Sequence, residues 1–233
     1  MRLSEGSLYP IDTRLRPSGS QGPLVSSSTG FVQYHRERAM LWERQALLRA
    51  RPVAGDLALG KAVLEQLHAT RYPQRLPPQA RAETHAMRLR IAATLGRQSD
   101  AILNVKAGRG ALVDIEFTVQ FLLLAYAGNR AALQQTSTRA ALLALGQEHI
   151  LSTQHTRVLL RAYSFFRLLE ARLRIVHDRP IAAIDFSGDA GERLARRMGF
   201  AAGRRPAQRL RRVYEQTTAA VRRVYNLTFK VKC

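Results

Sequence analysis

Hydrophobic residues recur at helical spacing along most of the chain, and stretches with the alternation of a strand are few. One strand is predicted over residues 8–16, closed by Pro17 and a glycine-containing turn, and a shorter one over 101–105. Helices are predicted over residues 28–51, 55–67, 78–95, 112–127, 137–145, 153–177, 191–198 and 206–228. The pattern therefore predicts a mainly α chain whose last helices form a bundle.

Composition favours a protein of the cytoplasm. The chain has 233 residues, of which 46% are hydrophobic, enough for a packed core in one large or two small domains. No apolar run reaches the roughly 18–20 residues that span a bilayer, and the first residues lack the charged-then-apolar pattern of a signal peptide. Cys233 is the only cysteine, so an intramolecular disulfide is excluded.

The formal net charge of +20 raises the alternative of a basic nucleic-acid-binding helical protein. Lysine occurs only at positions 61, 106, 230 and 232, so nearly all of the positive charge is arginine, which is spread over several predicted helices rather than collected on one. The sequence has no zinc-finger, helix-turn-helix or aromatic-plus-basic RNA-binding signature. An acidic protein partner or a nucleotide therefore explains the positive charge better than a nucleic acid does.

One carboxylate near the start of the chain has two arginines beside it. In the predicted strand, Asp12, Arg14 and Arg16 point to the same face, because side chains alternate along a strand. A magnesium ligand next to two guanidinium groups suits a polyphosphate–magnesium substrate. An edge strand with a surface ladder of Asp and Arg has the same spacing, and spacing alone does not separate the two interpretations.

Two blocks of the sequence resemble the bacterial glutamine synthetase adenylyltransferase/adenylyl-removing enzymes. The first block comprises Asp12-x-Arg14-Leu15-Arg16-Pro17-x-Gly19, Gly22-Pro23-Leu24-Val25, Tyr34, Trp42-Glu43-x-x-Ala46-Leu47-x-x-Ala50-Arg51 and Gly55-Asp56. The second comprises Lys106-x-Gly108-x-Gly110-x-x-x-Asp114-Ile115-Glu116-Phe117-x-x-Gln120. The blocks occur in the family's order and span about half of the chain. The chain departs from the second block at Ala111, where the family usually has a second consecutive glycine.

The resemblance implies a fold and an activity. Residues 1–105 would be the distal edge of a DNA polymerase beta-like nucleotidyltransferase domain with flanking helices, and residues 106–233 a helical bundle. The enzyme would transfer AMP from ATP to a tyrosine of glutamine synthetase, or remove it by phosphorolysis, and so regulate nitrogen assimilation. The segment from Arg16 to Gly19 resembles the adenylylating half more than the removing half. Glutamine synthetase and a nitrogen-signal regulatory protein would be the partners.

The sequence also lacks a part of the family's metal site. The family binds magnesium through an Asp-x-Asp pair, and no such pair occurs in this sequence. We therefore expect the chain to be the C-terminal part of one half of a longer enzyme, with Met1 an arbitrary beginning. Alone, it should be inactive.

The resemblance assigns roles to individual residues. Asp12 would be the third carboxylate, a catalytic residue and a ligand of Mg²⁺, with ATP as the substrate. The candidate phosphate-binding residues are Arg14, Arg16, Arg49, Arg51 and Lys106, and the candidate supporting residues are Trp42, Glu43, Asp114 and Glu116.

Plainer roles remain open for most of these residues. Arg16 could form a structural salt bridge, Trp42 could belong to the core, and Glu43 could be an internal clamp. Asp114 and Glu116 point to different faces of a helix, so both cannot serve one metal without special geometry. Asp114 is better interpreted as a helix-dipole residue or as the partner of an arginine.

A different class of function also remains open, namely a non-catalytic helical module that docks a partner protein. The six histidines show no metal-ligand spacing, and neither a P-loop nor a Ser–His–Asp arrangement is visible. The segment 108–110 is glycine-rich, which suits either a phosphate-binding loop or a plain turn.

Overall fold

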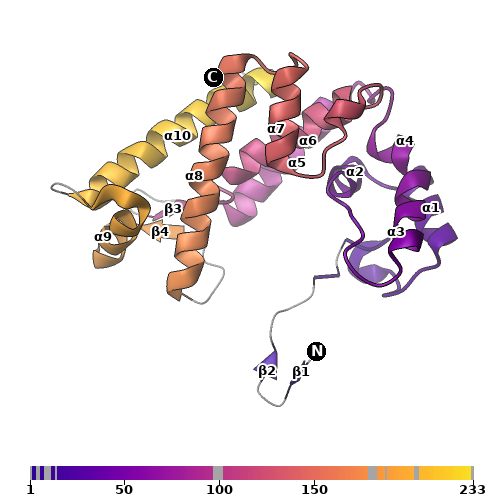
Figure 1. The fold of residues 1–233 in the computed structure, drawn as a ribbon, viewed down its shortest axis with the longest axis horizontal. Helices are drawn as coiled ribbons and strands as arrows, with labels where there is room; N and C mark the ends of the chain where they lie inside the picture. Colours follow the sequence, from indigo (N-terminus) through magenta and orange to yellow (C-terminus); the bar gives the residue numbers. More distant parts are fainter. Residues whose placement is uncertain are drawn as a thin grey trace.

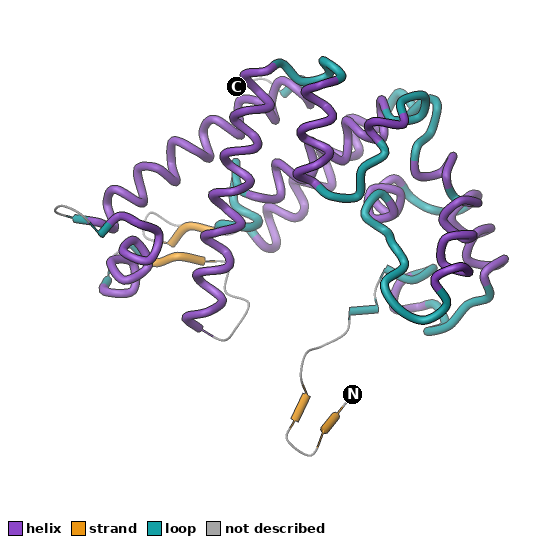
Figure 2. Tube along the Cα trace, in the orientation of Figure 1, coloured by secondary structure: helices purple, strands orange, loops and turns teal. Residues whose placement is uncertain are grey.

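Helices dominate the structure, a computed structural model that describes residues 2–3, 6–7, 12–13, 15–96, 102–177, 183–186, 188–201 and 205–231. The α-helices are α1 (Ser28–Glu37), α2 (Leu41–Leu47), α3 (Leu57–Gln66), α4 (His68–Arg71), α5 (Ala80–Leu95), α6 (Leu112–Tyr126), α7 (Thr138–Gln147), α8 (Thr153–His177), α9 (Asp189–Ala195) and α10 (Pro206–Phe229). Within these residues, four short strands form two antiparallel pairs, β1 (Arg2–Leu3) with β2 (Gly6–Ser7), and β3 (Ile102–Asn104) with β4 (Ala183–Asp185) (Figure 2). The mainly α fold predicted from the sequence is confirmed.

Local capping explains where several helices begin. The side chain of Ser27 accepts a hydrogen bond from the N–H of Gly30 at 3.1 Å, and Asp56 accepts one from Leu59 at 2.9 Å. Each satisfies a donor that the first helical turn leaves unpaired. Pro206 stands at the start of α10, where its missing N–H has no cost.

The helix predicted over residues 28–51 is in fact two helices, α1 and α2. The N–H of Met40 donates to Oε2 of Glu43 at 2.7 Å, and Met40 has an extended backbone. A hydrogen bond from the N–H before a helix to the carboxylate of the third helical residue marks the start of that helix. Helix α2 therefore begins separately at Leu41.

The strand predicted over residues 8–16 is wrong in its described part. Residues 12, 13, 15 and 16 are not in a strand, and the N–H of Arg16 donates to the carbonyl of Thr13 at 3.3 Å in a turn. The guanidinium of Arg16 binds the same carbonyl at 2.9 Å, so this side chain folds the segment back on itself. Residues 8–11 and 14 lie outside the described residues.

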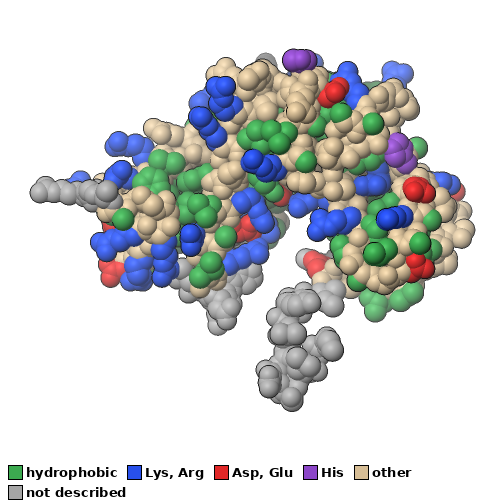
Figure 3. Space-filling view, in the orientation of Figure 1, with side chains coloured by type: hydrophobic (Ala, Val, Ile, Leu, Met, Phe, Trp, Pro, Cys, Tyr) green, Lys and Arg blue, Asp and Glu red, His purple; other side chains and the backbone are tan. Residues whose placement is uncertain are grey.

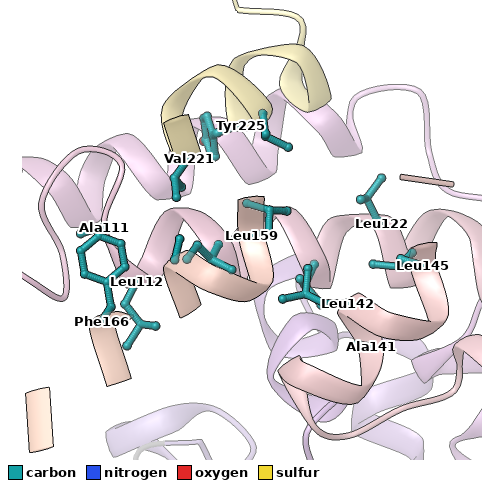
Figure 4. Packing of buried hydrophobic residues seen from close by; sticks show 14 of the residues in the cluster. Ala111, Leu112, Leu122, Ala141, Leu142, Leu145, Leu159, Phe166, Val221 and Tyr225 are labelled. Atoms are coloured by element: carbon teal, nitrogen blue, oxygen red, sulfur yellow. The ribbon is translucent and has the colours of Figure 1, made fainter. Parts of the chain in front are cut away.

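The largest hydrophobic core surrounds α6, which is buried on nearly every side and contacts α5, α7, α8 and α10. We call these five helices the bundle (Figure 1). A helix that is apolar all round must be covered by its neighbours. Leu112 of α6, Leu142 of α7, Leu159 and Phe166 of α8 and Tyr225 of α10 are among the core residues in Figure 4.

Helices α1–α4, here called the N-terminal lobe, lie at one side of the bundle (Figure 1). Their own small core contains Val32, Leu47 and Leu67. Arg71 of α4 is buried, and its Nε donates to the carbonyl of Leu47 at 3.0 Å. Helix α2 also contacts α5 and α6, so it joins the N-terminal lobe to the bundle.

Among the described residues, no helix is both long enough and apolar enough to cross a membrane. The space-filling view in Figure 3 shows Lys and Arg side chains on both the bundle and the N-terminal lobe.

Candidate functional site

A cavity of about 400 Å³ lies where the N-terminal segment, α2, α5 and α6 meet. The residues that line it are Leu15, Trp42, Gln45, Ala46, Arg49, Met87, Ile91, Phe117 and Gln120. Residues from both sequence blocks thus meet in one cavity although they are far apart in the chain. Asp12 is exposed and lies three residues before Leu15, which places it within about 11 Å of the cavity wall along the backbone. We call this the Trp42 cavity.

Trp42 is half-buried, and it forms a wall rather than part of the core. A neighbouring cavity of about 300 Å³ shares Trp42, Gln45 and Met87 with the first. Gln45 is buried, and its Nε2 donates to Oε1 of Gln120 at 3.3 Å, so this amide pair joins α2 to α6 beside the tryptophan. The Trp42 ring therefore remains accessible to a molecule in either cavity.

Two of the candidate charges pair with each other at this site. Nη1 of Arg49 lies 3.2 Å from Oε1 of Glu116, and the Arg49 side chain is half exposed. An ion pair in contact with water contributes at most about 1 kcal/mol. The protein therefore loses little stability if Arg49 leaves Glu116 and turns toward a phosphate.

Glu43 faces inward instead. It is buried, and its Oε1 accepts a hydrogen bond from the hydroxyl of Tyr34 at 2.9 Å while Oε2 caps α2. Glu43 therefore acts as an internal clamp, with Tyr34 and the backbone of Met40 rather than an arginine as its partners.

The other arginines of the first block differ in their surroundings. The guanidinium of Arg16 donates to the carbonyls of Thr13, Ser20 and Gly22 at 2.9, 3.5 and 3.2 Å, so it holds the loop together. Arg51 is exposed, and Arg14 lies outside the described residues.

Asp114 is the centre of a buried charge network. It is completely buried, and its Oδ1 accepts from Nε of Arg88 at 2.5 Å. Its Oδ2 accepts from Nη1 of Arg222 at 3.1 Å and from the N–H of Gly110 at 2.8 Å. An arginine partner was one of the two roles that the sequence left open for Asp114, and the structure has two such partners, from α5 and α10.

Arg88 also fixes the loop before α6. Its Nη2 donates to the carbonyls of Ala107 and Gly108 at 2.9 and 2.8 Å. The sequence analysis missed Arg88 and Arg222, because separations of 26 and 108 residues from Asp114 leave no local pattern. Lys106 is exposed in this loop and does not line the Trp42 cavity.

Two uncharged titratable side chains border the network. Nδ1 of His85 lies 2.9 Å from the hydroxyl oxygen of Tyr225, and the Arg222 guanidinium lies 4.4 Å from the centre of the Tyr225 ring. Burial lowers the pKa of His85; Arg222 and Arg88 lower it further, whereas Asp114 opposes them. Burial and the Asp114 charge raise the pKa of Tyr225. Both groups are therefore neutral at pH 7.

The glycine-rich loop packs against α10. Gly110 has φ +75°, and a Cβ atom on it would lie 2.1 Å from the carbonyl oxygen of Thr218. Since the N–H of Gly110 already donates to Asp114, the loop uses this donor within the protein. Ala111, the departure from the family pattern, is completely buried behind it.

The described residues contain no group of three or more His, Cys, Asp or Glu side chains that could hold a metal ion. Asp12 is a single exposed carboxylate. These residues therefore fit one ligand of a magnesium ion and do not fit a complete site.

Known proteins resemble both parts of the chain. A family model described as glutamate-ammonia ligase adenylyltransferase matches residues 1–66, and one described as GlnD PII-uridylyltransferase matches residues 79–229. A bifunctional glutamine synthetase adenylyltransferase/adenylyl-removing enzyme of Cutibacterium acnes is 34% identical over 224 residues, or 96% of this chain and 22% of that protein. The chain belongs to the glutamine synthetase adenylyltransferase/adenylyl-removing enzyme family.

Two more relatives of the same description support the assignment. That of Chromobacterium violaceum is 41% identical over 183 residues, which cover 78% of this chain and 20% of the relative. That of Streptomyces avermitilis is 32% identical over 225 residues, which cover 97% of this chain and 22% of the relative. The chain thus spans about one fifth of the length of the relatives it matches. The family resemblance inferred from the two sequence blocks is confirmed.

Gly110→Ala should strongly destabilise the chain, because it adds both backbone strain and a clash with α10. We expect a loss of at least about 3 kcal/mol in the free energy of unfolding, measured by urea denaturation. Gly199→Ala is the matched control, since Gly199 has φ +88° and open space around its Cβ position. It should cost only about 1 kcal/mol. Equal losses in the two variants would show that Thr218 yields to the extra atom.

Asp114→Asn should leave the buried guanidinium of Arg88 and the partly buried guanidinium of Arg222 without a counter-charge. Removing one partner of a buried ion pair costs about 3–5 kcal/mol, and we expect that loss in urea unfolding at pH 7. Glu215→Gln is the control, because the Arg211–Glu215 pair (2.8 Å) is exposed and should change stability by less than about 1 kcal/mol. A loss below 1 kcal/mol for Asp114→Asn would contradict the central role of this carboxylate.

Proposed function

We propose that this chain is the distal edge of a nucleotidyltransferase domain together with the helical region beside it. The enzyme transfers AMP from ATP to a tyrosine hydroxyl of glutamine synthetase, or removes it by phosphorolysis. The observation that carries this proposal is the Trp42 cavity, where the two blocks shared with the family meet. The names of the relatives supply the reaction and the protein substrate.

The two family matches support a refined domain division. They leave residues 67–78 between them, just before α5. Helix α5 contacts α6 and α10, and the carbonyl of Asn104 in β3 accepts a hydrogen bond from the hydroxyl of Tyr214 in α10 at 3.0 Å, so both α5 and β3 pack with helices that follow them in the chain. We therefore place the domain boundary before α5 rather than at the 105–106 position expected from the sequence.

Asp12 and Arg49 have different roles in the proposed reaction. Asp12 is proposed as one magnesium ligand, and the remaining ligands would have to come from outside the described residues, since no Asp-x-Asp pair occurs in the sequence. Magnesium, when bound with ATP, would neutralise phosphate charge. Among the described candidates, Arg49 at the cavity wall is the best-placed phosphate-binding residue, while Arg51 and Lys106 do not line that cavity.

The proposed partners and location rest on the same family membership. Glutamine synthetase is the proposed protein substrate, and the adenylylating half is the favoured one because of the segment from Arg16 to Gly19. The match of residues 79–229 to a model described as PII-uridylyltransferase supports a PII-type nitrogen-signal protein as the regulatory partner. We propose that the enzyme acts in the cytoplasm. Neither a docking module without catalysis nor nucleic-acid binding is favoured by these relatives.

The isolated chain should not transfer AMP, whereas a chimera should. In the chimera, this chain replaces the corresponding segment of the Chromobacterium violaceum relative, and labelled ATP, magnesium and glutamine synthetase are supplied. Asp12→Asn in the chimera should slow labelling of glutamine synthetase at least about 100-fold, because a charge close to the phosphates is lost. Its melting temperature should not change, since Asp12 is exposed. Labelling by the isolated chain, or normal transfer by the Asp12→Asn chimera, would reject these roles.

Arg49 and Glu116 can be separated by matched variants of the chimera. If Arg49 binds phosphate, Arg49→Gln raises the KM for ATP at least about five-fold, while Glu116→Gln frees Arg49 and leaves KM unchanged. If the pair is only a clamp between α2 and α6, both variants lower the melting temperature alike and leave KM unchanged. The second result would remove Arg49 from the proposed site.

A further inference from the structure

A second cavity of about 400 Å³ is lined by arginines on the α10 side of the bundle. The residues that line it are Arg109, Thr218, Ala219, Arg222, Arg223 and Asn226. None of these described lining residues carries a carboxylate, and three of the six carry a guanidinium group. The cavity shares no residue with the Trp42 cavity.

The helix and the loop together place the three guanidinium groups at this cavity. Positions 222, 223 and 226 lie three, four and seven residues after position 219 of α10, so the four share one helical face. Arg109 comes from the loop whose neighbour, Gly110, packs directly against Thr218. The close approach at Gly110 is therefore what brings Arg109 to Arg222 and Arg223.

Buried charge beside the cavity is unbalanced. Asp114 and Arg88 are 0% and 2% exposed, and Arg222 is 15% exposed in its side chain. One carboxylate here faces two guanidinium groups, which leaves one excess positive charge in a poorly solvated place, before Arg109 and Arg223 are counted. Such an excess is costly unless an anion neutralises it.

The Arg222 side chain is already ordered by its contacts within the protein. Its Nη1 is bound to Asp114, and its guanidinium lies over the Tyr225 ring at 4.4 Å. A side chain that is already ordered loses little conformational entropy when a ligand arrives. Arg109 and Arg223 are exposed and free of any carboxylate contact among the described residues, so they can close on the same ligand.

Other carboxylates near the cavity are already engaged. Asp114 is satisfied by its three donors, and Oε1 of Glu215, at the preceding turn of α10, lies 2.8 Å from Nε of Arg211. An internal counter-ion for Arg109 and Arg223 is therefore not among the described residues.

We propose that Arg109, Arg222 and Arg223 form a binding site for a phosphate-type oxyanion, distinct from the Trp42 cavity. Planar guanidinium groups donate paired hydrogen bonds to tetrahedral oxyanions, which a spherical halide cannot accept in the same way. The cavity is large enough for free phosphate, for pyrophosphate or for the phosphate of a nucleotide. Binding there would add a counter-charge directly beside the Asp114 network.

Isothermal titration calorimetry on the 233-residue chain at constant ionic strength tests the site. Inorganic phosphate, pyrophosphate and AMP are titrated separately, with sodium chloride as the reference ion. We expect at least one of the phosphate compounds to bind with one-to-one stoichiometry, and the tightest of them identifies whether free or nucleotide phosphate is preferred. No heat from any of the three, or equal binding of chloride, overturns the proposal.

Variants locate the binding. Arg109→Gln with Arg223→Gln should weaken the affinity at least about ten-fold, since two charge-assisted contacts are lost. Arg222 is left intact, because its removal would disturb Asp114. Arg157→Gln with Arg161→Gln is the matched control, since these two arginines line a separate groove between α7 and α8. It should bind as tightly as the unmodified chain. Unchanged affinity in the Arg109/Arg223 variant, or an equal loss in the control, overturns the assignment.

Discussion

The carboxylate of Asp114 is the interaction on which the arrangement of the bundle depends. Asp114 lies in α6 and accepts hydrogen bonds from Arg88 of α5 and Arg222 of α10, so its carboxylate joins three helices. Its third donor, the N–H of Gly110, draws the preceding loop into the same centre. Charges buried this deeply stabilise a structure only while each has its partner, so these helices must assemble together. This coupling explains why α5, which also contacts α2, is held against α6 and α10.

The same helix that holds Asp114 also carries the contacts to the N-terminal lobe. Asp114 and Glu116 are two residues apart, so on a helix they point to different faces, as the sequence analysis predicted. One faces α5 and α10, and the other pairs with Arg49 near the end of α2. Gln120, one turn after Glu116, receives a hydrogen bond from Gln45. Helix α6 therefore connects the buried network to the Trp42 cavity through its two faces.

Local signals predicted most of the fold. The caps at Ser27 and Asp56, Pro206 at the start of α10, and strong apolar periodicity define most helices within a few residues of the prediction. The predictions that failed depend on one side chain each. Glu43 caps the start of α2 at Leu41 and so divides the long helix that was expected. Arg16 stabilises a turn where a strand was expected. The roles of Arg88 and Arg222 could not be predicted, because they arise only when distant helices pack together.

The large positive charge becomes easier to interpret once the arginines are followed individually. Arg16, Arg71 and Arg88 each donate to main-chain carbonyls, which the planar, many-donor guanidinium does better than a lysine ammonium. These arginines serve as internal supports, so their charge says little about a nucleic-acid surface. Arg109 and Arg223 differ, because their guanidinium groups face a cavity that no described carboxylate lines. A positive charge that supports a loop and one that awaits a ligand look the same in the composition, and the contacts of each side chain distinguish them.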